Sequence, residues 1–119
     1  MSFEKLDVFR KAYDLSLVVH RRSLSFPELE QRELASQLRR SSKSICANLA
    51  EGMAKQASAR DVVRFLRMSI GSCDETCLWL QYAQDLGYIQ ADERQRLHEA
   101  YCEVGRMLVG LVKRWSAKL

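Results

Sequence analysis

The stretch LASQLRRSSKSICANLAEG, residues 34–52, decides the fold that this sequence predicts. Its large apolar residues recur at steps of four and seven, which places them on one side of a helix: Leu34, Leu38, Ile45 and Leu49. Arg39, Arg40 and Lys43 gather on another side. Small residues lie between these two sides and would let a second helix approach closely: Ser41, Ser42, Ser44, Ala47 and Ala50. A helix with a core face, a basic face and a close-contact face is expected at the centre of the protein.

Three further segments have the same helical periodicity, so the sequence predicts helices over residues 5–24, 27–54, 58–86 and 91–117. Pro27 can begin the second helix, Ser58 is a favourable N-cap for the third, and Gly87 is expected to end the third in a left-handed conformation. The seam of the third helix is predicted to be Val63, Leu66, Ile70, Cys73, Cys77 and Leu80. Short loops force neighbouring helices to run antiparallel. The predicted fold is therefore all-α, an up-down-up-down four-helix bundle forming one domain over residues 1–119.

Hydrophobicity and charge along the sequence indicate where in the cell the protein is expected. The longest apolar runs fall well short of the roughly 20 residues that cross a bilayer, and the first residues are charged where a signal peptide would be apolar. We therefore expect a cytoplasmic protein with no membrane partner and with reduced cysteines. The formal net charge is +4, and the basic excess lies between residues 21 and 72, where ten Lys and Arg face five Asp and Glu.

Apolar residues outnumber those that a single bundle core can bury. Besides their main stripes, three of the predicted helices carry further large apolar side chains: Val8, Leu15, Val18, Phe65, Met68, Trp79, Tyr82, Met107, Val109 and Val112. A second buried surface between copies of the chain would accommodate them, so we predict a homo-oligomer. The alternative is a large, well-filled core.

Cysteine and histidine residues are the strongest candidates for chemistry. Cys73 and Cys77 on the third helix could face His98 and Cys102 on the fourth, and four such ligands would suit zinc. Their spacing favours another interpretation, core thiols with a histidine at the rim, because both third-helix cysteines fall at seam positions. The sequence has no phosphate-binding glycine loop or dinucleotide fingerprint, and neither histidine has a nucleophile signature around it. We expect no enzymatic activity, no catalytic residue, no metal and no cofactor.

Basic residues from the first to the third helix form a candidate nucleic-acid-binding set: Arg21, Arg22, Arg39, Arg40, Lys43, Lys55, Arg60, Arg64 and Arg67. The last three follow an i, i+4, i+7 pattern and therefore share one stripe. If the second and third helices bring their basic stripes together, the patch would bind phosphate backbones without reading sequence. The alternative is ordinary salt bridging with acidic neighbours, which include Glu30, Glu33 and Asp61.

The run SICANLAEG, residues 44–52, resembles the S-I-x-x-N-[IL]-A-E-G signature of a bacterial four-helix-bundle family. This family comprises the proteins encoded in intervening sequences of 23S ribosomal RNA genes, and it is related to the accessory variability protein of diversity-generating retroelements. The resemblance covers nearly the whole chain. Further matching pieces are LDVFRKA (residues 6–12), FP (26–27), QLRR (37–40), FL (65–66), GS (71–72) with Glu75, and LGYI (86–89). Cys46 stands where the signature often has proline.

The resemblance implies a homopentameric ring of bundles. For the retroelement relatives it implies binding to nucleic acid and to a reverse transcriptase, whereas for the intervening-sequence branch it implies no defined activity. The signature positions expected to be structural are Asn48, Glu51, Gly52, Ser72 and Glu75. From the residues themselves, Asn48 and Glu51 are expected to clamp a neighbouring helix through Arg64, Ser72 or a backbone group. The alternative to nucleic-acid binding is a protein-interaction scaffold or accessory subunit.

Overall fold

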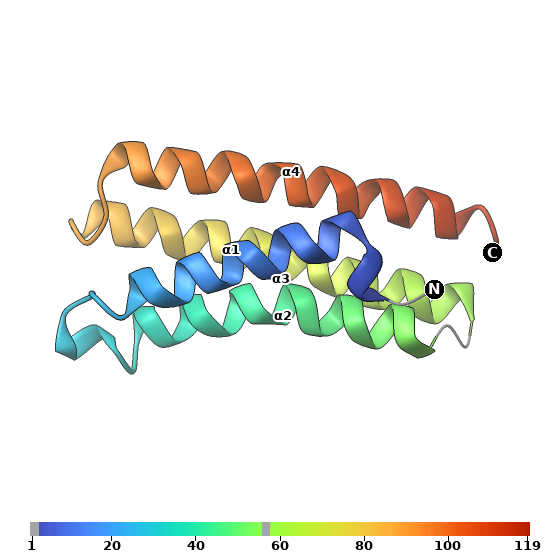
Figure 1. Cartoon of the computed structure of the whole chain (residues 1–119), viewed down its shortest axis with the longest axis horizontal. Helices are drawn as coiled ribbons and strands as arrows, with labels where there is room; N and C mark the ends of the chain where they lie inside the picture. Colours follow the sequence, from blue (N-terminus) through green and yellow to red (C-terminus); the bar gives the residue numbers. More distant parts are fainter. Residues whose placement is uncertain (1–2, 56–57) are drawn as a thin grey trace.

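The computed structural model describes residues 3–55 and 58–119 and consists of four long α-helices. These are α1 (Asp7–Ser23), α2 (Leu34–Lys55), α3 (Ala59–Asp85) and α4 (Ala91–Ser116), with short 3-10 helices at Phe3–Lys5 (η1) and Glu28–Glu30 (η2). Successive α-helices run antiparallel, and they form a rod of 46 × 24 × 20 Å (Figure 1). α2 packs between α1 and α3, and α4 packs against both α3 and α1. The predicted all-α four-helix bundle is confirmed, and the described residues contain no strand.

The second helix begins at Leu34, so the prediction that it starts at Pro27 is wrong. Pro27 is extended, with φ −55° and ψ 151°, and the chain after it makes the 3-10 turn of η2. The side chain of Gln31 donates a hydrogen bond to the carbonyl oxygen of Phe26 at 3.0 Å, and the Phe26 ring is buried. This local fold replaces the first turns of the predicted helix.

Two predicted helix ends are confirmed by their geometry. The hydroxyl of Ser58 accepts a hydrogen bond from the backbone N–H of Asp61 at 3.1 Å, which caps the start of α3. Gly87, which follows α3, has a φ of 84°, a conformation that a glycine adopts without steric cost. The remaining ends, apart from the start of α2, lie within about two residues of the predicted positions.

The buried face of α3 is rotated toward α2 relative to the predicted seam. Val62, Ser69 and Thr76 are fully buried, whereas Ile70 and Cys77, which were predicted as seam residues, are only partly buried. Small residues on α2 allow this close approach, as their pattern predicted. Three contacts of 2.9 Å join the two helices: Ser69 donates to the carbonyl oxygen of Ile45, and hydroxyl groups pair between Thr76 and Ser41 and between Ser72 and Ser44.

Three of the signature residues, Asn48, Gly52 and Ser72, lie along this α2–α3 seam. Asn48 donates hydrogen bonds to both the carbonyl and the hydroxyl oxygen of Ser44, at 2.9 and 3.0 Å. These two bonds stay within α2, and it is Ser44 that contacts Ser72 of α3. Asn48 therefore orients a residue of the α2–α3 contact and makes neither of the predicted side-chain bonds to Arg64 or Ser72. Gly52 lies at a close approach of the two helices, since a Cβ atom there would come within 2.7 Å of the Cβ of Phe65. Glu51 is exposed on the outer side of α2.

No helix within the described ranges combines the length and apolar character that crossing a bilayer requires.

Candidate nucleic-acid interface

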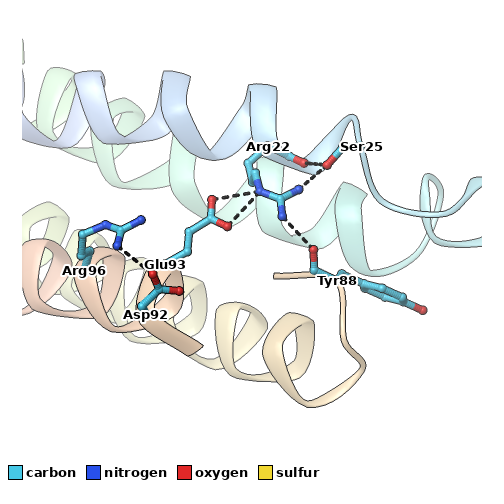
Figure 2. A network of polar contacts seen from close by, with 6 residues as sticks. All are labelled: Arg22, Ser25, Tyr88, Asp92, Glu93 and Arg96. Atoms are coloured by element: carbon cyan, nitrogen blue, oxygen red, sulfur yellow. Dashed lines mark hydrogen bonds and ion pairs between the residues drawn. The ribbon is translucent and has the colours of Figure 1, made fainter. Parts of the chain in front are cut away.

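Arg22, one of the predicted nucleic-acid-binding residues, is engaged inside the protein. Its Nε donates to both carboxylate oxygens of Glu93 on α4, at 2.9 and 3.0 Å. One of its remaining nitrogens bonds the hydroxyl of Ser25, and the other donates to the carbonyl oxygen of Tyr88 at 2.9 Å. Figure 2 shows how this one side chain reaches the end of α1, the α3–α4 turn and the start of α4. Arg22 therefore ties the bundle together at this end and presents little charge to a ligand.

Arg39 is engaged in the same way between α1 and α2. Its guanidinium donates to the hydroxyl of Ser23 at 2.8 Å and to the carbonyl oxygen of Gln31 at 2.9 Å. A third contact reaches the side-chain oxygen of Gln31 at 3.2 Å. These bonds hold the segment that precedes α2 against the end of α1. The charge of Arg39 still acts at a distance, but three of its five N–H donors are occupied.

His20, Arg21 and Lys43 form a positive edge between α1 and α2, which we call the α1–α2 basic edge. Lys43 Nζ lies 2.7 Å from Nδ1 of His20, a geometry that suits a neutral imidazole accepting from the ammonium group. Slight burial and the positive charges of Lys43, Arg39 and Arg21 lower the pKa of His20. Burial is the largest cause of this lowering, and the three neighbouring cations add to it because they disfavour the charged histidine.

Arg60, Arg64 and Arg67 form a second positive surface, the α3 basic face. All three side chains are exposed on the first half of α3. Arg64 lies 3.9 Å from Asp61 and over the ring of Phe65, 4.5 Å from its centroid. Among the described residues, no carboxylate lies within 4.0 Å of Arg60 or Arg67. The three cations are therefore weakly compensated, and exposed pairs such as Arg64–Asp61 neutralise little.

The two positive surfaces stay apart within one chain. Ser72 of α3 lies opposite Ser44 of α2, so along the bundle axis Arg60 is displaced from Lys43 by about 18 Å and Arg67 by about 8 Å. Lys43 also faces α1, whereas α3 packs on another side of α2. The second and third helices are neighbours as predicted, but their basic stripes do not merge into one patch.

The other predicted site residues take different positions. Arg40 is exposed and lines a small polar hollow of about 200 Å³ between α2 and α3, together with Ser72 and Glu75. Glu75 accepts a hydrogen bond from the indole N–H of Trp79 at 2.9 Å. Lys55 also belongs to the predicted basic set, but its side chain lies outside the described part of the chain.

The predicted juxtaposition of thiols and imidazole between the third and fourth helices is present. Cys73, Cys77, His98 and Cys102 line one cavity between α3 and α4. Within residues 3–55 and 58–119, no group of three or more His, Cys, Asp or Glu side chains is placed to hold a metal ion. The cavity lies on the α3–α4 side of the bundle, away from the α1–α2 basic edge.

Sequence patterns missed the residues that neutralise or occupy the arginines. Glu93 lies far from Arg22 along the chain, and Gln31 falls in a segment predicted to be regular helix. His20 showed no signature, although it lies in the basic last turn of α1, next to Arg21. Gln31 and Glu93 could be recognised as partners of these arginines only once the order of the helices showed that they lie at the same end of the bundle.

The order and packing of the helices define the class: an antiparallel four-helix bundle. The chain belongs to the family of 23S rRNA-intervening sequence proteins, whose family model matches residues 4–110, as its motifs predicted. A solved structure with the same fold is a protein of unknown function from the S23 ribosomal protein family of Bacteroides thetaiotaomicron. The two share 23% sequence identity with a TM-score of 0.82, over 95% of this chain and 99% of that one. No curated protein matches this chain.

Proposed function

We propose that this protein is a cytoplasmic, non-enzymatic homo-oligomer that binds RNA or DNA through exposed cations. The observation that carries the proposal is the α3 basic face, where three adjacent arginines project outward with one weak acidic contact. Arg60 and Arg67 are separated by about 10 Å along the helix axis, a span over which a single nucleic-acid strand presents about three phosphates. The face would therefore hold a backbone electrostatically and would not read its sequence.

The α1–α2 basic edge supports the same function. After burial, its cations contribute to lowering the pKa of His20, and phosphate groups bound there would offset the repulsion between them. Because the edge and the α3 basic face are separated, a single chain offers two short binding surfaces and not one continuous one. Several copies in a ring would repeat both surfaces, and the electrostatic fields of the copies would add.

Exposed apolar side chains on the second half of α3 support assembly into an oligomer. Leu78 and Tyr82 are each 50% exposed and lie one helical turn apart, with the partly buried Trp79 beside them. The Trp79 and Tyr82 rings are 5.7 Å apart. Leu86 continues this surface at the end of the helix. A cluster of this kind is typical of a protein–protein interface, and we propose that it contacts a second copy, in a pentamer as the family resemblance implies.

The first prediction concerns the salt dependence of binding. We expect the protein to bind a generic RNA duplex with an affinity that falls steeply as salt rises. We expect Arg60→Gln/Arg67→Gln to weaken binding and to reduce the slope of log K against log salt by about 2 for each subunit engaged. Fluorescence anisotropy over a range of potassium chloride concentrations measures both effects.

The matched control for this test is Arg96→Gln/Arg106→Gln, which removes the same charge from exposed positions on α4. It should change the slope much less. Absent binding at low salt, or equal losses in both variants, would contradict the proposed interface. An oligomer that binds no nucleic acid would favour the protein-interaction scaffold instead.

The second prediction concerns assembly. We expect sedimentation at micromolar concentration to give a mass five times the 13.8 kDa of one chain. We expect Leu78→Glu/Tyr82→Glu to give a folded particle of one chain mass, because two carboxylates would be desolvated in the proposed contact. Leu29→Glu is the control, since Leu29 is 73% exposed near η2 and should leave the assembly intact. Wild-type protein sedimenting as a single chain would refute the oligomer.

A further inference from the structure

A cavity of about 670 Å³ lies between α3 and α4. Its lining is mainly apolar, with Ile70, Tyr101 and Val109 among the contributing side chains. Val109 is 42% exposed, so part of the cavity wall is an apolar side chain that the fold leaves uncovered. The volume is within the range of sites that hold small organic molecules.

The cavity is long and narrow. On α4 its lining runs from His98 to Lys113, which spans about 22 Å of helix. On α3 the lining runs from Ile70 to Cys77. A volume of about 670 Å³ that is spread over this length suits an extended chain better than a compact ring system.

Two glycines in the α4 wall keep the cavity open. Gly105 and Gly110 both line it, and a Cβ atom at either position would meet nothing within 4 Å. Glycine inside a helix is less favourable than alanine by about 1 kcal/mol. The close contact with Phe65 explains Gly52 of α2, but no such contact explains the two glycines of α4. What these two glycines provide is space in the cavity, which a side chain would occupy.

Positive charge gathers at one end of this cavity. Arg106 and Lys113 belong to its lining, and Gly110 lies between them on the same stripe of α4. Because Gly110 has no side chain, the two cations flank a gap. Both cations are exposed, and among the described residues no carboxylate lies within 4.0 Å of either. The gap is therefore suited to an anionic group.

The acidic residue of the lining, Asp74, lies toward the other end. The thiol of Cys73 donates to the carbonyl oxygen of Tyr101 at 3.2 Å, which puts these two residues at the same height of the antiparallel helices. Asp74 follows Cys73 directly, whereas Lys113 lies about 18 Å beyond Tyr101 along α4. The cavity is therefore positive at the Lys113 end and apolar along its middle.

We propose that the α3–α4 cavity binds a linear aliphatic carboxylate, a fatty acid of medium chain length. The carboxylate lies over Gly110, where Arg106 and Lys113 supply charge-assisted hydrogen bonds. The hydrocarbon chain follows the apolar wall past Gly105 toward Tyr101, and its burial supplies the hydrophobic part of the affinity. This site uses no residue of the α1–α2 basic edge or the α3 basic face, so it does not depend on the function proposed above.

The test is isothermal titration calorimetry of the native protein with dodecanoate, below the concentration at which this acid forms micelles. We expect saturable binding with one site for each chain. Dodecanol has the same chain and no charge, so it should bind at least about tenfold more weakly. Equal binding of the two compounds, or uptake that does not saturate at one site for each chain, would overturn the proposal.

The charged end is tested with Arg106→Gln/Lys113→Gln. This variant should lower the affinity for dodecanoate to about that for dodecanol, and it should leave dodecanol binding unchanged. Both positions are exposed, so the variant is expected to fold. An unchanged preference for dodecanoate would show that these two cations do not hold the carboxylate.

Gly105→Leu tests the apolar part of the cavity. The open space at Gly105 and the higher helix propensity of leucine favour a folded variant, while the new side chain takes the place of the ligand chain. We expect the affinity for dodecanoate to fall at least about tenfold. Gly71→Leu is the matched control, because Gly71 also has open space around it and lies outside the cavity lining. The control should bind as the native protein does.

Two outcomes for Gly105→Leu would contradict the proposal. Binding of dodecanoate equal to that of the native protein would place the ligand elsewhere. A fall in the sedimenting mass of Gly105→Leu, with Gly71→Leu unaffected, would show that the cavity holds a second copy of the chain and not a small acid. If Gly105→Leu does not fold, the comparison of dodecanoate with dodecanol and the charge variant still decides the question.

Discussion

Replacing Tyr101 with alanine is expected to lower the free energy of unfolding by about 3–5 kcal/mol. Tyr101 is the largest fully buried side chain of the bundle, with none of its surface exposed. It belongs to α4, and the thiol of Cys73 on α3 donates to its backbone carbonyl oxygen at 3.2 Å. Burial raises the pKa of its hydroxyl. Removing the ring would leave a cavity at the centre of the core, which rigid helices cannot close. Urea unfolding followed by circular dichroism measures the loss.

Tyr101→Phe is the matched variant, and it should behave in the opposite way. The hydroxyl of Tyr101 is buried and has no hydrogen-bond partner among the described residues. An unpaired buried hydroxyl is unfavourable by about 1–3 kcal/mol, so its removal should leave stability unchanged or raise it. If Tyr101→Phe lowered the free energy of unfolding by more than about 1 kcal/mol, the size of one hydrogen bond, this hydroxyl would have a partner in solution.

Gly52→Val is expected to destabilise the protein by about 3 kcal/mol, because it overpacks a close contact between α2 and α3. A new Cβ atom at Gly52 would come within 2.7 Å of the Cβ of Phe65. Phe65 cannot relieve this overlap by changing rotamer, since its Cβ is fixed to the backbone. The two helices would have to separate, which would also lengthen the three serine and threonine contacts along the seam.

Gly71→Val is the control for Gly52→Val. Gly71 lies exposed in α3, and a Cβ atom there would meet nothing within 4 Å. Valine has a modestly higher helix propensity than glycine, so stability should change by less than about 0.5 kcal/mol. Thermal or chemical unfolding of both variants compares them directly. Equal effects at the two positions would show that helix propensity, and not the contact with Phe65, decides the outcome at Gly52.

Helical periodicity was sufficient to predict the number, order and approximate extent of the α-helices. It failed at the start of α2, where Glu28 and Glu30 follow a proline and thus satisfy the usual rules for a helix N-terminus. The chain instead turns there because the side chain of Gln31 bonds the backbone before it. The same Gln31 side chain also bonds the carbonyl oxygen of Ser23 at the end of α1, and Arg39 of α2 donates to Gln31. Helical periodicity does not encode these contacts. The rotation of α3 toward α2 was missed for a related reason, since Ser69 and Thr76 are polar and become core residues only through partners on α2.

The sequence predicts which basic residues belong to the candidate interface, but it does not predict how they are arranged in the fold. The sequence indicates where arginines gather, and the α3 basic face follows directly from the spacing of Arg60, Arg64 and Arg67. It does not indicate which arginines already have partners. Arg22 and Arg39 look equivalent to the others until the fold brings them to Glu93 and Gln31. Charge patterns therefore overestimate a binding surface wherever helix ends meet.

The turn between α3 and α4 is expected to resist changes of length, unlike most surface loops. The carbonyl oxygen of Tyr88 receives the Arg22 guanidinium, the Tyr88 ring packs on Phe26, and its hydroxyl donates to Glu30. Adding one residue here would move all three contacts at once. A fluorescent tag or affinity peptide inserted at this turn would therefore loosen the bundle, and the exposed end of the chain after Ser116 is the better place to attach one.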